Sequence, residues 1–176
     1  KDYRKTYDVY KDDTLLNRQP KKSRKIFVCL DEQRGQYLVD GLVAMDFPLS
    51  SGVKAYPTKT GDYAVISKKE DHTSNLYGKM YDAEGKCINY NAESTDPIPE
   101  GGRFDGSPMP YWQRLTNAGL GLHVGKVRRH PVSHGCVRLP RNVAEILYRQ
   151  TSIGTPVTIR KTPLPVPEAQ KVPAVQ

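Results

Sequence analysis

The stretch KIFVCLDEQRGQYLVDGLVAMDF, residues 25–47, contains three short apolar runs separated by turn residues. The runs are rich in β-branched and aromatic residues, which favour strands over helices. Asp40-Gly41, between the second and third runs, is typical of a two-residue hairpin turn. We therefore expect a meander of three antiparallel strands. The predicted strands are residues 25–30, 36–40 and 42–47.

Runs of the same kind continue along the chain, and AEGK (83–86) between two of them places Gly85 in a turn. They are residues 62–67, 79–82, 87–90, 111–116 and 156–161. One segment differs: RNVAEILYRQ, after Pro140, has the spacing of a helix with one apolar face. We predict a mainly β, mainly antiparallel fold with a single short helix.

Length and composition place few limits on function. A chain of 176 residues fits one domain with tails, and 37% hydrophobic and 26% charged residues are typical of a globular protein. No run approaches the roughly 18 apolar residues needed to span a membrane. The net charge of +8 predicts either weak attraction to polyanions such as acidic lipid or wall polymer, or a merely solvated basic surface. No basic strand carries interleaved aromatics, so we expect no nucleic-acid partner.

The chain divides by composition into three parts. Residues 1–23 are polar and basic and predict a lead-in or linker, and residues 162–176, TPLPVPEAQKVPAVQ, predict an extended Pro-rich tail. Residues 24–161 are the expected folded domain. Within it, residues 91–110 lack periodicity and predict a long loop, either mobile or forming the wall of a cleft. The first residues lack the apolar stretch of a signal peptide, so we expect a removed signal or a trimmed start.

Cys136 is the most informative of three cysteines. With Cys29 and Cys87 it forms no CxxC pair, which argues against a disulfide framework or a four-cysteine zinc site. Cys29 lies in an apolar run and predicts an inert core thiol. Cys136 instead follows Ser133-His134-Gly135, where the glycine permits a sharp turn and close approach of a ligand. Inward-pointing N–H groups of Gly135 and Cys136 would stabilise an oxyanion.

A nucleophilic cysteine needs a base, because a thiol with a pKa of about 8.5 is mostly protonated at neutral pH. His123 ends the strand-like GLGLH and can supply an imidazole; His130 and His134 are alternatives. We favour His123, because the apolar strand before it fixes its position. Two other interpretations remain open at this point: a packed, inert thiol, and a metal site built from Cys136 and these histidines. The absence of CxxC and HxxxH argues against metal, and we expect no cofactor.

Two further side chains are candidates for substrate contact. Arg138 lies two residues beyond Cys136 and would share its face in a strand, where a guanidinium can bind a carboxylate in bidentate fashion; a surface arginine is the alternative. Tyr111 and Trp112 precede the strand that ends at His123. We expect one of them in the core and the other at the cleft, and assign the substrate contact to Tyr111.

These residues closely resemble a known active-site signature, that of the L,D-transpeptidase catalytic domain family. The signature is a histidine, a spacer, then Ser-His-Gly-Cys and a hydrophobic residue, here His123 followed by Ser133-His134-Gly135-Cys136-Val137-Arg138. The resemblance covers roughly residues 25–160 and includes Pro57-Thr58-Lys59-Thr60-Gly61. Many members have glycine directly after the histidine; this chain has Val124-Gly125, as in a His-x-Gly subgroup, which leaves acceptor specificity open.

The resemblance implies a β-sandwich or open barrel with the cysteine at the bottom of a cleft, acting on peptidoglycan stem peptides. By this likeness Cys136 attacks the carbonyl of the third residue of a donor tetrapeptide and expels D-alanine, with His123 as general base. The backbone from His134 to Cys136 would form the oxyanion hole, Arg138 would hold substrate, and Ser133 would support the loop or orient a catalytic group.

The resemblance also implies a location and partners. We expect a monomer in the bacterial cell envelope, periplasmic or otherwise outside the cytoplasm, with no signal or anchor in this chain. The acyl group would pass to the amine of a second stem (a 3→3 crosslink), a D-amino acid or the lysine of an envelope protein. Two alternatives are an L,D-carboxypeptidase that uses water as acceptor and a wall-binding module without turnover.

Overall fold

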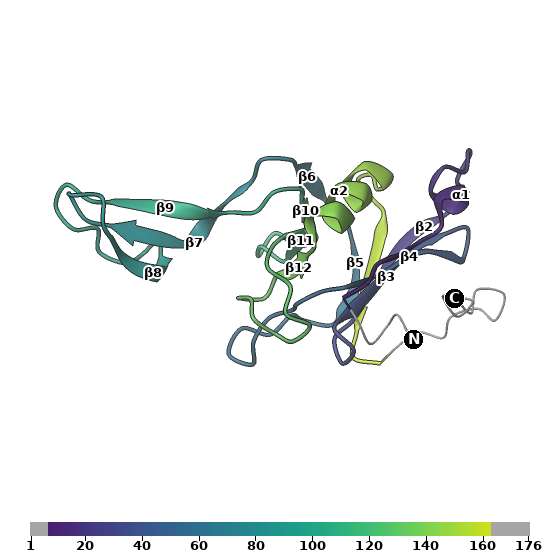
Figure 1. The fold of residues 1–176 in the computed structure, drawn as a ribbon, viewed down its shortest axis with the longest axis horizontal. Coiled ribbons are helices and arrows are strands. Elements are labelled where there is room, and N and C mark those ends of the chain that lie inside the picture. The colour runs from purple at the N-terminus through teal and green to yellow at the C-terminus, as the bar shows by residue number, and fades with distance from the viewer. Residues whose placement is uncertain (1–6, 163–176) are drawn as a thin grey trace. The chain divides into compact units, whose positions relative to one another are not determined.

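The predicted meander is present in the structure, a computed structural model that describes residues 7–162. It consists of β2 (Arg24–Cys29), β3 (Arg34–Val39) and β4 (Leu42–Pro48), each antiparallel to the next. Asp40 and Gly41 both have positive φ, 51° and 81°, as a two-residue hairpin turn with the twist of the flanking strands requires. The meander is the centre of a six-stranded sheet (Figure 1).

The remaining strands of this sheet come from both ends of the described chain and from its middle. They are β1 (Tyr10–Lys11), β5 (Gly61–Ala64) and β13 (Pro156–Arg160), in the sheet order β1-β4-β3-β2-β13-β5. β13 runs parallel to β2 and antiparallel to β5, so the last strand lies between the first strand of the meander and the edge strand β5. The predominance of antiparallel strands is as predicted.

A second, four-stranded sheet carries the candidate site. It contains β6 (Ser67–Lys69), β10 (Trp112–Arg114), β11 (Gly121–Val124) and β12 (Val137–Leu139), in the order β12-β11-β10-β6. The predicted helix after Cys136 is α2 (Arg141–Gln150). Apolar side chains from both sheets and from α2 share one core, which includes Ile26, Tyr37, Phe47, Leu122, Val137, Leu139, Val143, Leu147 and Ile159. One face of the second sheet is apolar because it packs in this core with α2.

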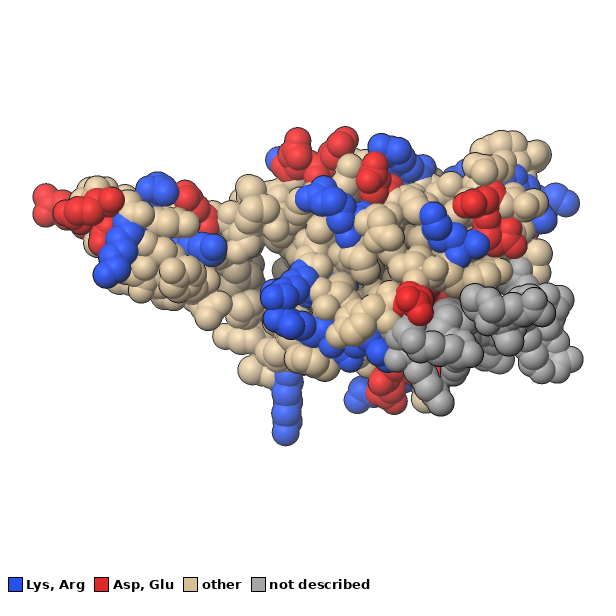
Figure 2. Space-filling view, in the orientation of Figure 1, with Lys and Arg blue, Asp and Glu red and all other residues tan. Residues whose placement is uncertain are grey.

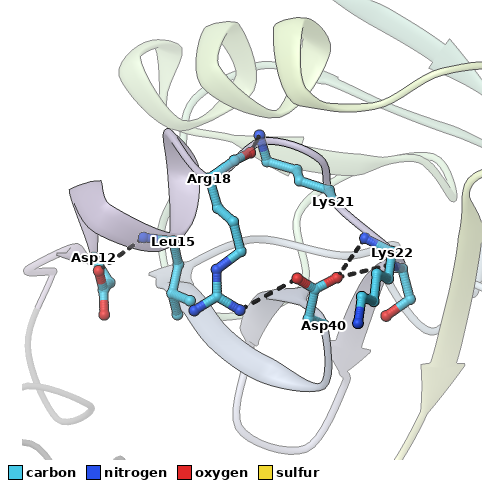
Figure 3. Close-up of polar contacts among 7 residues, drawn as sticks. Asp12, Leu15, Arg18, Lys21, Lys22 and Asp40 are labelled. Carbon is cyan, nitrogen blue, oxygen red and sulfur yellow. Dashed lines mark hydrogen bonds and ion pairs between the residues drawn. The ribbon is translucent and has the colours of Figure 1, made fainter.

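The expectation that residues 1–23 form a lead-in without packed structure is wrong for the residues described. β1 pairs with β4, and α1 (Asp13–Leu16) buries Leu15 and Leu16 in the main core. The Asp12 side chain caps α1 by accepting a hydrogen bond from the Leu15 N–H at 3.0 Å (Figure 3). A segment of four residues is too short to show helical periodicity, so the polar composition around it dominated the prediction. Residues 1–6 lie outside the described part.

Asp40, in the hairpin turn, holds the end of this N-terminal segment. Its carboxylate accepts hydrogen bonds from the N–H groups of Lys22 and Ser23 at 2.6 and 2.9 Å and pairs with Arg18 at 3.2 Å (Figure 3). The hydrogen bond from Ser23, with those from Arg18 and Lys22, holds the pKa of Asp40 below its ordinary value. The turn residue that shapes the hairpin therefore also fixes the segment that precedes the meander.

Residues Lys69–Pro110 form a second unit with its own antiparallel sheet. Its strands are β7 (Thr73–Tyr81), β8 (Cys87–Glu93) and β9 (Arg103–Pro108), in the order β8-β7-β9. β9 lies in the segment predicted to be a loop. The sheet exposes apolar side chains such as Leu76 and Ile88, so the usual alternation between buried apolar and exposed polar positions is weak here. Of the helices in residues 7–162, none combines the length and apolar character of a membrane span.

Candidate active site

Strands β11 and β12 place His123, Cys136 and Arg138 on one face of the four-stranded sheet. The two strands are parallel, with Leu122 opposite Val137 and His123 opposite Arg138. Leu122 and Val137 are buried in the core, and because side chains alternate along a strand, His123 and Arg138 face the other way. Cys136 directly precedes β12 and so precedes Arg138 by two positions. The structure therefore brings together the three side chains that the sequence selected.

The Cys136 thiol is partly buried in this arrangement. Its Sγ donates a hydrogen bond to the carbonyl oxygen of Gly119 at 3.2 Å. Burial raises the pKa of the Cys136 thiol above its ordinary value, against a hydrogen bond from the Gly121 backbone and the positive charges of Arg114 and Arg138, which lower it. Because burial has the larger effect, this thiol needs a base to become a nucleophile at neutral pH.

His123 is oriented by its own backbone neighbour. The side chain is buried, and its Nδ1 lies 2.7 Å from the carbonyl oxygen of Val124. A carbonyl oxygen only accepts hydrogen bonds, so this contact requires the proton on Nδ1 and leaves Nε2 as the basic nitrogen. Trp112 lies beside the imidazole, with ring centroids 6.1 Å apart. The arrangement suits a neutral histidine that takes a proton at Nε2.

Ser133 supports the loop before the cysteine. Its hydroxyl donates to the carbonyl oxygen of Cys136 at 2.5 Å and accepts from the Gly135 N–H at 3.1 Å. Gly135 has a φ of +122°, which a side chain would strain. These contacts fit the predicted loop-supporting role of Ser133. They also occupy the Gly135 N–H, one of the two predicted oxyanion donors.

Thr58, from the Pro57–Gly61 motif, ties this loop to a neighbouring segment. Its buried hydroxyl accepts a hydrogen bond from the Gly52 N–H at 2.8 Å and donates one to the Gly135 carbonyl oxygen at 2.6 Å. Gly52 itself forms a bridge with Ser133. The threonine therefore fixes the backbone one residue before Cys136, a role that the motif alone did not reveal.

Neighbouring residues position both the backbone and the side chain of Arg138. Its backbone N–H and carbonyl exchange hydrogen bonds of 2.9 and 3.1 Å with Ser50. Its side chain lies over Gly125, where a Cβ atom would be 2.8 Å from both Cγ and Cδ of Arg138. The glycine of the His-x-Gly sequence thus leaves space for the arginine stem.

The remaining predicted side chains, those of His134, His130 and Tyr111, have other surroundings. His134 is exposed with its ring 4.8 Å from that of Tyr56, and His130 is exposed in the spacer loop. Tyr111 packs against the core, with its ring 5.5 Å from Tyr148 of α2. Its neighbour Trp112 is buried and is the aromatic residue beside His123.

In the described residues, no three His, Cys, Asp or Glu side chains are grouped as metal ligands would be. Comparison with known proteins identifies the family. Residues 23–159 match the L,D-transpeptidase catalytic domain, YkuD. The chain belongs to this family.

Three similar proteins illustrate the relationship within the L,D-transpeptidase family. The probable L,D-transpeptidase 3 of Mycobacterium tuberculosis is 31% identical over 121 residues, which are 65% of this chain and 38% of that protein. A crystal structure of a cysteine-to-serine mutant of the Enterococcus faecium L,D-transpeptidase is 27% identical with a TM-score of 0.57, covering 79% of this chain and 50% of that one. Mycobacterium tuberculosis L,D-transpeptidase 3 in complex with a faropenem-derived adduct is 24% identical with a TM-score of 0.57, covering 78% and 60%. This chain therefore spans well under half the length of the probable L,D-transpeptidase 3 of Mycobacterium tuberculosis.

Sequence reasoning missed Arg114 in this L,D-transpeptidase domain. Arg114 and Trp112 alternate with the fully buried Gln113 on β10 and so share the face of His123. The alternation is visible in YWQRLT, but the sequence does not reveal which of its two faces meets the core. The charge of the whole chain gives no help, because on the face that Figure 2 shows Lys and Arg are interspersed with Asp and Glu.

Proposed function

We propose that this chain catalyses acyl transfer on peptidoglycan stem peptides, with Cys136 as nucleophile and His123 as general base. The observation that carries the proposal is the pairing of β11 with β12, which sets His123 opposite Arg138, two positions after Cys136. Membership of the L,D-transpeptidase family supports the reaction class. The catalytic domain is proposed to be residues 24–161, with β1 and α1 packed on it.

In the first step His123 activates the thiol. Nε2 accepts the proton that Sγ of Cys136 otherwise shares with the Gly119 carbonyl. The Val124 carbonyl, 2.7 Å from Nδ1, stabilises the resulting imidazolium and keeps the ring oriented. The Arg114 and Arg138 charges stabilise the thiolate, because both lower the thiol pKa against burial.

The thiolate then attacks the carbonyl carbon of the third residue of a donor tetrapeptide. The Cys136 N–H is the proposed oxyanion donor, since the Gly135 N–H is engaged by Ser133 in the resting protein. As the C–N bond to the terminal D-alanine breaks, the imidazolium returns its proton to the leaving amine. The product is a thioester on Cys136 and free D-alanine, with Arg138 binding a substrate carboxylate.

In the second step an amine acceptor attacks the thioester. His123 takes a proton from the attacking amine and gives it to the departing sulfur, which regenerates the thiol. The acceptor is proposed to be the side-chain amine of a second stem, which gives a 3→3 crosslink, or a D-amino acid or envelope-protein lysine. This substrate would place the domain outside the cytoplasm, at the cell wall. We propose that it acts there as a monomer.

Product analysis with a purified muropeptide tetrapeptide tests this function. The wild-type chain should form dimers and release D-alanine, and Cys136→Ala should form neither while retaining its circular dichroism spectrum. Tripeptide without dimer, in the presence of amine acceptor, would assign the L,D-carboxypeptidase reaction instead. If the tetrapeptide is unchanged, the remaining alternative is a wall-binding module without turnover.

A β-lactam provides an independent probe of the nucleophile. The faropenem-derived adduct on a relative of the same fold supports testing this drug class here. Faropenem should add mass to the wild-type chain and to Cys29→Ser, but not to Cys136→Ser. An adduct that persists in Cys136→Ser would contradict the assignment of the nucleophile.

A further inference from the structure

Arg114 occupies a position level with the thiol on the same sheet face. It pairs with Gly121 across β10 and β11, and Gly121 in turn lies beside Cys136, since the next pair along is Leu122 with Val137. The three residues therefore form a row across neighbouring strands. With strands about 4.8 Å apart, the row is about 10 Å long between its end Cα atoms.

The middle of this row has no side chain. A Cβ atom at Gly121 would lie 2.5 Å from the Trp112 ring, so glycine allows the indole to lie over this position. The Arg114 guanidinium in turn stacks on the indole, with its Cζ 5.4 Å from the ring centroid. One guanidinium nitrogen, Nη1, donates to the Thr116 carbonyl oxygen at 3.4 Å. An arginine on an aromatic face keeps its N–H groups at the edge of the guanidinium plane, so the groups that Thr116 does not engage can bind a planar anion.

Neither arginine on this face is neutralised. In the part of the chain that the structure describes, Arg114 and Arg138 form no ion pair with Asp or Glu. By contrast, the fully buried Arg34 pairs with Asp46 at 2.6 Å. Both site arginines are partly buried, where an unpaired charge is unfavourable and an incoming anion is attracted strongly. Two such charges beside one nucleophile predict a ligand with two negative groups.

We propose that Arg114 is a second carboxylate-binding residue of the donor site, so that the stem peptide is held between the guanidinium groups of Arg114 and Arg138. This inference rests on the proposed function. One guanidinium binds the C-terminal carboxylate of the donor, and the other binds a carboxylate on the side chain of its third residue. The preferred donors are stems whose third residue is a diamino dicarboxylic acid with a free carboxylate, over stems in which that group is amidated or in which the residue is lysine.

The electrostatic part of the proposal can be measured without peptidoglycan. Iodoacetate and iodoacetamide alkylate the same thiolate and differ in charge, so the ratio of their rates at Cys136 reports anion attraction and cancels the thiol ionisation. The ratio should fall several-fold in Arg114→Gln and in Arg138→Gln. Arg149→Gln is the matched control, because it removes an exposed charge paired with Glu145 on α2, and its ratio should equal that of the wild type. An unchanged ratio in Arg114→Gln would overturn the proposal.

The specificity part uses paired donors on the full chain. The ratio of kcat/KM for a tetrapeptide with a free third-residue carboxylate to that for its amide should exceed one, and Arg114→Gln should remove most of this preference. Arg114→Lys, which keeps the charge but not the bidentate geometry, should be intermediate and serves if the glutamine variant does not fold. If the wild type processes both donors equally, the proposal fails and the proposed function stands. If it processes neither, the proposed function fails, and the alkylation ratio still decides whether Arg114 attracts anions.

Discussion

The Thr58 hydroxyl donates a hydrogen bond of 2.6 Å to the carbonyl oxygen of Gly135, across 77 positions of the chain. The same hydroxyl accepts from the Gly52 N–H, so one side chain fixes two backbone segments at the residue before Cys136. We infer that the position of the nucleophile depends on this contact.

Replacing Thr58 tests this dependence. Thr58→Val leaves the buried N–H of Gly52 and the partly buried carbonyl of Gly135 without the Thr58 hydroxyl and should lower the free energy of unfolding by about 1–3 kcal/mol. The rate of Cys136 acylation should fall as well. Thr58→Ser keeps the hydroxyl and should retain most of both properties. Urea denaturation and stopped-flow acylation measure them, and equal acylation rates in the valine and serine variants would refute the positioning role.

Gly125 and Arg138 are predicted to act as a unit. A methyl group at Gly125 would press on Cγ and Cδ of Arg138, each 2.8 Å away, and displace a flexible side chain without disturbing the core. Gly125→Ala should therefore raise KM for the donor with little change in melting temperature. In an Arg138→Gln background the same substitution should have almost no further effect. Additive effects in the double variant would show that Gly125 acts by another route.

The alkylation rate of Cys136 should depend on pH in a definite direction. Because burial raises the thiol pKa, the rate with neutral iodoacetamide should still be increasing at pH values above about 8.5, the ordinary thiol pKa. Arg138→Gln removes a positive charge that lowers this pKa, so its profile should move to higher pH. A rate that is constant from pH 6 to 8 would mean that the thiolate is already formed in the resting protein.

The N-terminal helix α1 should contribute to stability. Leu15 is 3% exposed and packs in the core, so Leu15→Ala should lower the free energy of unfolding by about 2–5 kcal/mol. Leu76→Ala, at a side chain that is 53% exposed, is the control and should change stability by less than about 0.5 kcal/mol. Chemical denaturation monitored by fluorescence measures both. Equal denaturation midpoints for Leu15→Ala and Leu76→Ala would mean that residues 7–23 do not stabilise the fold.

Local patterns were sufficient to predict part of the fold. The meander could be predicted because apolar residues, hairpin turn and strand lengths all lie within residues 25–47, and α2 because ten residues show its period. By contrast, α1 is one turn long, and β9 lies in a sheet that exposes apolar side chains. Neither has a local pattern strong enough to distinguish it from a loop.

The candidate site was predictable where its residues lie in one motif. Ser133 to Arg138 form one segment, His123 lies ten residues before it, and their proposed roles came from the local sequence and from its resemblance to the family signature. Thr58 and Arg114 reach the site through long-range pairing, which alternation within one strand does not determine. The contact of Trp112 with His123 was not predicted for a related reason: adjacent residues on a strand face opposite sides, and the sequence alone does not say which side meets His123.

The most direct test of the central claim is the intact mass of the protein after brief incubation with a tetrapeptide donor in the absence of acceptor amine. The account predicts an adduct equal to the donor minus D-alanine, mapped by proteolysis to Cys136. It should be present in Cys29→Ser and Cys87→Ser and absent from Cys136→Ser. An adduct on another residue, or crosslinked dimers made by Cys136→Ser, would contradict the account.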